Sequence, residues 1–337
     1  MVVILDPKDT GTKALGATVP VTSPVAEDTT FVSAQNKLVE KLAGDVIIGS
    51  TVTFSVAPFL TVVDKAIVQS AAGTHTLKRS CFESVQAMLL NPVKYVKSPT
   101  FMLMWGVYAS TYSTANSLKT LVEHQEYANT SKQKSASKSS TRTSSDFGKV
   151  GIFLGTTVVN SGASLLKDRS YAKMFGTKTV QSSIPRMSYA LWMARDLSVV
   201  GSSFILPDLL YPHLVDTYGF NESSAKNISQ LSLPIAAQFV AGPLHFMGLD
   251  LYNRNLDAKL WPEAIADRGK ALYRGAVPVI VARIARIFPG YGFGGVLNTK
   301  CRDRWRDYLV QREVKKMMEN PQKENASKLV ALVHSKR

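Results

Sequence analysis

Cysteine and histidine are scarce in this sequence of 337 residues, which contains two cysteines and five histidines. Cys81 and Cys301 lie far apart, so the sequence predicts neither a disulfide framework nor a metal cluster, and we expect no cofactor. No strand–turn–helix pattern surrounds the glycine-rich segment Gly290–Gly295, which indicates helix packing rather than a dinucleotide site. The two cysteines have no histidine partner that the sequence can assign, so the chain is not expected to be an enzyme.

Acidic side chains are fewer than basic ones: the sequence has 25 Asp and Glu against 40 Lys and Arg, a formal net charge of +15 at pH 7. Such a balance suggests nucleic acid, an anionic membrane surface or an anionic solute as a partner. The longest basic run lies in the tail after Cys301 without a nucleic-acid-binding motif, so nucleic acid is not expected. A small-molecule solute and a lipid bilayer, with anionic lipid as a candidate, are the expected partners.

Continuous apolar runs of about twenty residues are also absent, yet six segments combine apolar residues with Gly, Ser, Thr and Pro. This composition is typical of helices packed in a membrane bundle, and Gly44 and Gly49 form a small-residue face on which another helix can approach closely. Several segments are uncharged over about the length that crosses a hydrocarbon layer. A soluble helical protein is the less favoured alternative. The segments are Lys37–Gln69, Ser98–Leu118, Phe147–Lys167, Tyr189–Leu210, Ile228–Leu251 and Val277–Asn298.

Three of these segments end in a similar way, with a proline or glycine followed six or seven residues later by an aspartate and then a basic residue. The aspartates recur about every 80 to 105 residues, which predicts a repeated helix-pair unit. Helix ends commonly carry charges, so a chance recurrence is the alternative. The three sets are Pro58, Asp64 and Lys65; Gly162, Asp168 and Arg169; and Pro243, Asp250 and Arg254.

The three repeats, together with the segment Leu272–Tyr291, resemble the mitochondrial carrier family. In that segment the family's pattern is matched by Tyr273, Arg274, Gly275, Pro278, Arg286 and Pro289. Two departures mark a divergent member: the acid follows the proline by six or seven residues rather than two, and the second repeat has no proline.

The resemblance implies an all-α membrane protein with six transmembrane helices in three pseudo-repeats around a central cavity. It further implies a multi-pass transporter in the mitochondrial inner membrane that moves a small anionic or zwitterionic metabolite by alternating access. The alternative is a carrier-fold scaffold or adaptor that no longer transports. The expected divisions are an N-terminal tail (1–36), repeat 1 (37–127), a Ser/Lys-rich linker (128–146), repeat 2 (147–220), repeat 3 (221–312) and a basic tail (313–337).

Two groups of site residues follow from this reading. Three acid–base pairs are expected to close a gate on the matrix side, unless they are unconnected charges at a wet interface: Asp64 with Lys65, Asp168 with Arg169, and Asp250 with Arg254. Charges inside the bilayer are costly unless they face a cavity or one another, so the charged residues within the apolar segments are candidates for substrate binding. The pair Arg195–Asp196 could instead brace two helices. These candidates are Arg195, Asp196, Arg283 and Arg286, with Met104 as the first-repeat counterpart. Helix kinks are expected at Pro58, Pro243 and Pro289.

Overall fold

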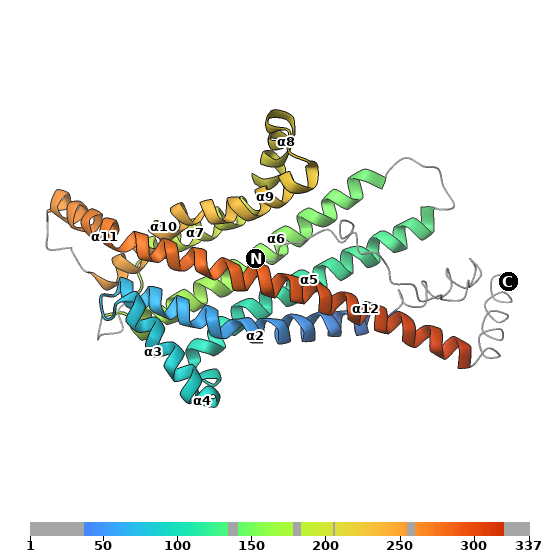
Figure 1. Cartoon of the computed structure of the whole chain (residues 1–337), viewed down its shortest axis with the longest axis horizontal. Coiled ribbons are helices and arrows are strands. Elements are labelled where there is room, and N and C mark those ends of the chain that lie inside the picture. The colour runs from blue at the N-terminus through green and yellow to red at the C-terminus, as the bar shows by residue number, and fades with distance from the viewer. Residues whose placement is uncertain (1–36, 134–140, 178–182, 205, 255–259, 320–337) are drawn as a thin grey trace.

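The computed structural model describes residues 37–133, 141–177, 183–204, 206–254 and 260–319, and these residues form helices and connecting turns without a strand. The molecule is an elongated bundle whose long helices run along its main axis (Figure 1). The long helices are α2 (Leu38–Ala71), α5 (Pro99–Gln133), α6 (Thr141–Phe175), α11 (Trp261–Ile287) and α12 (Gly294–Glu319). The shorter elements are α3 (Leu77–Leu90), α4 (Pro92–Val96), α7 (Arg186–Phe204), α8 (Leu206–Tyr218), α9 (Glu222–Ala236), α10 (Gln238–Asn253) and the π-helical turn η2 (Phe288–Phe293).

Helix α2 is the apolar centre of the bundle and packs along α5. The predicted small-residue face is confirmed, because a Cβ atom on Gly49 would lie 2.8 Å from the backbone nitrogen of Ser113 and one on Gly44 would overlap the ring of Trp305. The indole Nε1 of Trp105 also donates to the carbonyl of Ser50 at 2.9 Å. Glycines therefore let α5 and α12 approach the backbone of α2 closely.

The expectation of six membrane-crossing helices is only partly met. Among the residues described, α2 is the one helix that is both long enough and apolar enough to cross a membrane. The segment Tyr189–Leu210 is divided between α7 and α8, and Ile228–Leu251 between α9 and α10. Pro207 and Pro234 lie near these breaks, and a proline cannot donate the backbone hydrogen bond that would continue a helix. The all-helical class is confirmed, whereas three carrier-type repeats of paired helices are not.

The three prolines expected at kinks lie in different surroundings. Pro58 lies within α2 and Pro243 within α10, and both helices continue through them. Pro289 lies in η2, where the helix widens to a π-helical turn between α11 and α12. The phenol of Tyr112 donates to the carbonyl of Gly290 in this turn at 2.6 Å, which satisfies a backbone acceptor where the regular ladder is interrupted.

The expected tails lie largely outside the described residues, whereas most of the expected linker is described and is helical. Helices α5 and α6 extend into the linker, to Gln133 and from Thr141, and α12 extends to Glu319. Residues 1–36, 134–140 and 320–337 are not described. The proposed division into repeats and tails therefore stays a prediction.

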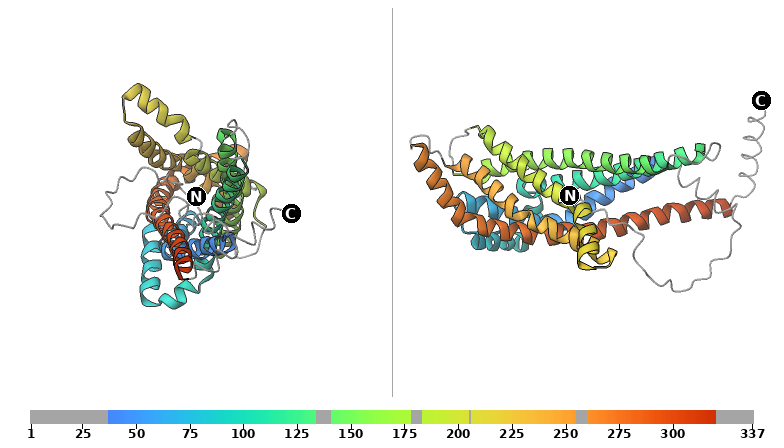
Figure 2. Two further views of the ribbon diagram at one scale, coloured as in Figure 1. Left: turned by 90° about the vertical axis from the view of Figure 1, so that its right-hand side faces the viewer. Right: turned by 90° about the horizontal axis from the view of Figure 1, so that it is seen from above.

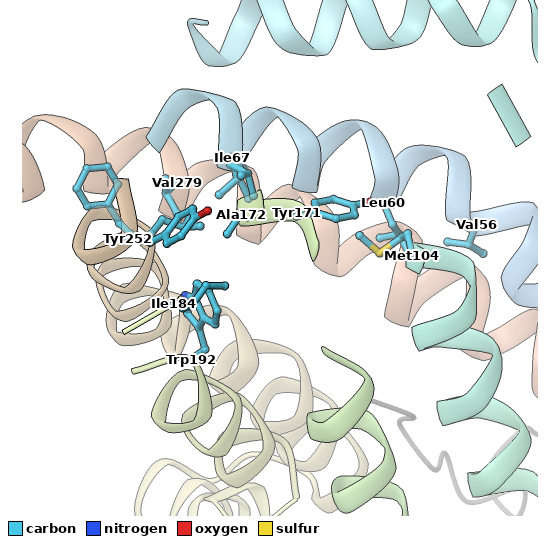
Figure 3. Packing of buried hydrophobic residues seen from close by; sticks show 14 residues of the cluster. Val56, Leu60, Ile67, Met104, Tyr171, Ala172, Ile184, Trp192, Tyr252 and Val279 are labelled. Atoms are coloured by element: carbon cyan, nitrogen blue, oxygen red, sulfur yellow. The ribbon is translucent and has the colours of Figure 1, made fainter. Parts of the chain in front are cut away.

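The main apolar core lies between α2, α5, α6, α7, α10 and α11. Figure 3 shows Ile67 and Tyr252 close to one another at one end of this core, and Leu60 and Met104 at the other, with Tyr171 between the two groups. All five side chains are almost fully buried. The core thus fixes the helices that carry the polar residues described below.

Helices α3 and α4 form an arm that projects from the side of the bundle (Figures 1 and 2). The amphipathic pattern of α3 is inverted: Ser80 and Ser84 are buried against the protein, whereas Phe82 is 69% exposed and Leu89 is 71% exposed. An apolar face that points away from its own protein marks a surface for an apolar partner.

Candidate functional site

A polar cavity opens between α5, α6, α7, α10 and α11, with a volume of about 60 Å³. All five residues predicted to bind substrate line it: Met104, Arg195, Asp196, Arg283 and Arg286. The other lining residues are Val107, Tyr108, Asn160, Ser164, Lys167, Val199, Val200, Gln238 and Ile287. Because one water molecule needs about 10–15 Å³ on this measure, the cavity holds a few waters. It must widen before it admits a solute of amino-acid size.

A chain of alternating charges runs beside the cavity and begins on α11. The Arg286 guanidinium contacts the Asp64 carboxylate of α2, with 2.5 Å between Nη1 and Oδ1. The Lys167 ammonium of α6 contacts the other oxygen of Asp64 and also Oδ1 of Asp168, the latter at 2.7 Å. Asp64 is 1% exposed and Lys167 is 4% exposed. Buried charges of this kind are stable only when paired, so the contacts connect α2, α6 and α11.

The chain continues into α7 through Arg195. Its Nη1 lies 2.6 Å from Oδ2 of Asp168, and its Nη2 lies 2.8 Å from Oδ1 of Asp196. Arg195 is thus held by two carboxylates, which matches the bracing alternative for the Arg–Asp pair. Its guanidinium already has its anionic partners.

Arg283 on α11 is held differently, by neutral groups. Its Nε donates to Oε1 of Gln238 at 2.9 Å, and its Nη1 lies 3.1 Å from Nδ1 of His245. Arg283 is 3% exposed, and among the residues described its side-chain contacts are these two neutral groups rather than a carboxylate. A buried guanidinium that lines a cavity without an anionic partner has the charge and the planar fork that suit a carboxylate, which such a fork can bind through two hydrogen bonds.

Asp196 supplies the opposite charge to the same cavity. Its Oδ1 is bound by Arg195, but its buried Oδ2 has no hydrogen-bond partner within the described part of the chain. A carboxylate oxygen in this state can accept from a bound ammonium group. The cavity therefore presents one unpaired site of each sign.

The residues of the predicted matrix gate are only partly brought together. Asp64 and Asp168 are joined through Lys167, but their expected partners lie elsewhere: Lys65 lies over the ring of Phe175, 5.7 Å from its centroid, and Arg169 is exposed. The gate role of these residues stays a prediction.

Asp250 lies in a cluster of its own at the end of α10. Its Oδ1 lies 2.5 Å from Nε of Arg254, as the sequence predicts, and its Oδ2 lies 2.6 Å from Nη1 of Arg268 on α11. Arg268 also donates to the carbonyl of Arg254 at 3.2 Å. This cluster ties the end of α10 to the start of α11.

A second polar cluster, which sequence reasoning missed, joins α2, α5 and α12 at the opposite end of α2. Asp45 is fully buried, and its carboxylate accepts from Arg302 at 3.0 Å, from Arg306 at 3.4 Å and from the hydroxyl of Thr120. Arg302 also contacts Glu123 at 3.2 Å. Asp45 is the last charge before the uncharged run 46–63 of α2, and this position is the signal that could have revealed the cluster.

Lys167, Gln238 and His245 are further site residues that sequence reasoning did not single out as such. Lys167 offers a signal, since it is the first charge after an uncharged run. Gln238 and His245 offer none, because neither carries a fixed charge. Over the part of the chain that the structure describes, no group of three His, Cys, Asp or Glu side chains could hold a metal ion.

The comparisons with known proteins overturn the resemblance to the mitochondrial carrier family. The family whose model matches is described as "Probable citrulline exporter" and covers residues 48–306, and no carrier family matches. The physical reason for the error is that a proline followed by an acid and a base is common wherever an apolar helix ends at a wet interface. The mitochondrial inner membrane was inferred from that resemblance and has no support here.

No curated protein and no solved structure matches the chain. The family match spans more than half of the sequence and includes every residue of the cavity. The chain therefore belongs to the probable citrulline exporter family and is a membrane protein with a role in transport.

Proposed function

We propose that this protein carries a zwitterionic amino acid with an uncharged polar side chain, of which citrulline is the first candidate, across a membrane. The observation that carries the proposal is the buried guanidinium of Arg283, which lines the cavity and is held by neutral groups only. The family description supports the same class of solute.

The cavity offers a complement for each part of such a solute. The α-carboxylate would bind Arg283, and the α-ammonium would bind the unpaired Oδ2 of Asp196. An uncharged polar side chain such as a ureido group needs both donors and acceptors. Asn160, Ser164 and Tyr108, which line the same cavity, supply them.

The charge of the site disfavours a cationic side chain on the solute. Four cations and one anion line the cavity, and two further carboxylates pair with these cations, which gives a net charge of 4 − 3 = +1. The cations are Lys167, Arg195, Arg283 and Arg286, the lining anion is Asp196, and the pairing carboxylates are Asp64 and Asp168. An amino acid with a second positive charge would be repelled by this excess, whereas citrulline would not.

Alternating access is the mechanism that we propose. The cavity is small, about 60 Å³, and an ionic cluster lies on either side of it, one around Asp250 and one around Asp45. At a rise of about 1.5 Å per residue, Asp250 lies roughly 18 Å along α10 from Gln238 at the cavity, and Asp45 lies roughly 28 Å along α2 from Asp64. Opening one end would break one cluster and leave the other in place.

A lipid environment would explain the apolar surface of the described helices. Large apolar side chains point outward from several of them, including Phe59 (60% exposed) on α2, Val158 (72%) on α6 and Phe239 (63%) on α10. The inverted face of α3 would rest at the membrane surface, where Lys78 and Lys94 of the arm can meet anionic headgroups. Fractionation of cells that express the tagged chain would identify the membrane, with the mitochondrial inner membrane as one location to test.

Uptake of labelled citrulline by liposomes that contain the purified protein tests the proposal. We expect saturable uptake that Arg283→Gln lowers at least thirtyfold, because a buried carboxylate that loses its charged partner costs about 2–5 kcal/mol. Arg274→Gln is the matched control, since Arg274 is exposed on the same helix. Absence of citrulline uptake, or equal uptake by Arg283→Gln and the natural chain, would refute the proposal.

A further inference from the structure

His245 lies on α10 beside the proposed carboxylate site and has a role that packing alone does not explain. It is 1% exposed, and its Nδ1 lies 3.1 Å from Nη1 of Arg283. Gln238, the other partner of Arg283, precedes it by seven residues, which is about two helical turns and places both side chains on the same face of α10. Arg283 is therefore held by α10 at two points.

The contact with Arg283 determines where the imidazole carries its proton. A guanidinium has only donors, so Nδ1 of His245 must accept, and the ring is neutral with its proton on Nε2. The Nε2 atom is buried and has no acceptor among the residues described. A doubly protonated ring has no lone pair for Arg283, so the imidazolium form of His245 and this contact exclude one another.

Charged groups on three other helices act on His245 electrostatically. They are Arg283 on α11, which contacts the ring, Arg195 on α7, and Lys167 and Asp168 on α6. Three of these four groups are cations. An imidazolium at this position requires that one of the cations moves away or is neutralised by an added anion.

We propose that His245 binds a proton when a solute carboxylate binds Arg283, so that one proton crosses the membrane with each solute molecule. This inference rests on the proposed function. The carboxylate neutralises Arg283 and draws its guanidinium away from the ring, which leaves Nδ1 free to take a proton from the water on the loading side. Asp168 is the one anion among these four groups, and although Lys167 and Arg195 already bind it, its charge would stabilise the imidazolium electrostatically. On the other side, solute and proton leave together and Arg283 returns to Nδ1, with no bond in the solute made or broken.

The coupling has two measurable consequences. Linkage is reciprocal, so lowering the pH must raise the affinity for the solute by the same factor by which the solute raises the affinity for the proton. A neutral zwitterion that moves with one proton also transfers one positive charge per cycle. With the membrane potential held at zero, a gradient of one pH unit should therefore support about tenfold accumulation of citrulline.

The experiment uses liposomes that contain the full-length protein and a trapped pH-sensitive dye, with labelled citrulline outside. Potassium with valinomycin on both sides holds the membrane potential at zero. We then expect one proton to enter per citrulline molecule and about tenfold accumulation under a gradient of one pH unit. His245→Gln preserves an acceptor for Arg283 but cannot be protonated, so its uptake should equilibrate without accumulation and without proton entry. His213→Gln is the matched control, because His213 is exposed on α8 and the coupling should be unchanged.

The outcomes separate the two proposals. Citrulline uptake by the natural chain without proton entry would overturn the coupling and leave the transport function standing, whereas absence of uptake would overturn both. Accumulation by His245→Gln equal to that of the natural chain would also overturn the role of His245. If His245→Gln does not fold, the ratio of protons to citrulline measured on the natural chain still decides whether the coupling exists.

Discussion

Asp64→Asn removes the carboxylate that lies between the cations Lys167 and Arg286. Asp64 is the acidic group through which α2 connects to both α6 and α11. Asparagine has nearly the same shape but no charge, so the change removes the charge and leaves the packing of α2 almost intact. We expect the folded state to lose stability because two cations then face one another in the interior.

The size of the effect follows from how deeply the partners are buried. The side chains of Asp64 and Lys167 are 1% and 5% exposed, while Arg286 is 22% exposed. Removing one member of a buried pair costs about 3–5 kcal/mol. Because Arg286 retains some solvent and Lys167 keeps its contact with Asp168, we expect a value near the lower end of that range.

The matched control is Asp250→Asn, because the side chain of Asp250 is as deeply buried as that of Asp64. Its partner Arg254 is 36% exposed, more than either partner of Asp64, while Arg268 is 18% exposed. Solvent therefore screens the charge of Arg254 that the change leaves unpaired. We expect a loss of about 1 kcal/mol, at the upper end of the range for exposed pairs.

Unfolding of both variants in mixed detergent micelles, followed by helical content as the denaturing detergent is increased, measures the difference. The double variant Asp64→Asn with Lys167→Met should be more stable than the sum of the two single changes predicts, since it removes the charge left unpaired. Equal losses for Asp64→Asn and Asp250→Asn, or strictly additive effects in the double variant, would refute the reasoning.

Three other predictions concern separate parts of the molecule. Arg283→Lys keeps the positive charge but loses the bidentate fork, so citrulline uptake should fall about tenfold, less than for Arg283→Gln. Equal loss of uptake in Arg283→Lys and Arg283→Gln would argue that the charge is unimportant. Gly248→Val should lower the free energy of unfolding by about 1–3 kcal/mol in the same assay, because a Cβ at Gly248 would lie 2.3 Å from Nε1 of Trp192. An unchanged unfolding midpoint would contradict the close packing of α7 on α10. Phe82→Ser should make Cys81 on α3 more reactive toward a membrane-impermeant maleimide in liposomes, because the apolar face would no longer hold the arm at the lipid surface. Unchanged labelling of Cys81 would show that the arm does not rest on lipid.

The cavity was the most predictable part of the site. Charges inside apolar segments are costly unless they face a cavity or each other, and that reasoning alone selected Arg195, Asp196 and Arg283, which line one cavity. What the sequence left open is which of these charges is already paired. Arg195 is taken up by Asp168 and Asp196, whereas Arg283 is not, and only the positions of neighbouring helices decide between the two.

The partners of the aspartates could not be predicted because adjacent residues on a helix point about 100° apart. The sequence suggests that Asp168 pairs with Arg169, but the rotation of α6 directs Arg169 to the surface and Lys167 into the interior. The same uncertainty applies to Asp64, whose partners are Lys167 and Arg286 rather than its neighbour Lys65.

The family could not be identified from the repeated pattern because each part of it has a general physical cause. A small or cyclic residue near the end of an apolar helix, followed by an acid and a base, suits any helix that leaves an apolar layer. Breaks such as those near Pro207 and Pro234 divided two of the expected helices, and these breaks depend on tertiary packing as much as on the prolines.

The assignment of the two charges to Arg283 and Asp196 is tested by comparing uptake of citrulline with uptake of two analogues, one without the α-carboxylate and one without the α-ammonium group. The liposomes contain the natural chain, Arg283→Gln or Asp196→Asn. We expect the natural chain to take up citrulline and to reject both analogues. We also expect Arg283→Gln to lose discrimination against the analogue without a carboxylate, and Asp196→Asn against the analogue without an ammonium group. Equal uptake of all three compounds by the natural chain, or the same selectivity in both variants, would contradict the assignment of the two charges to these two residues.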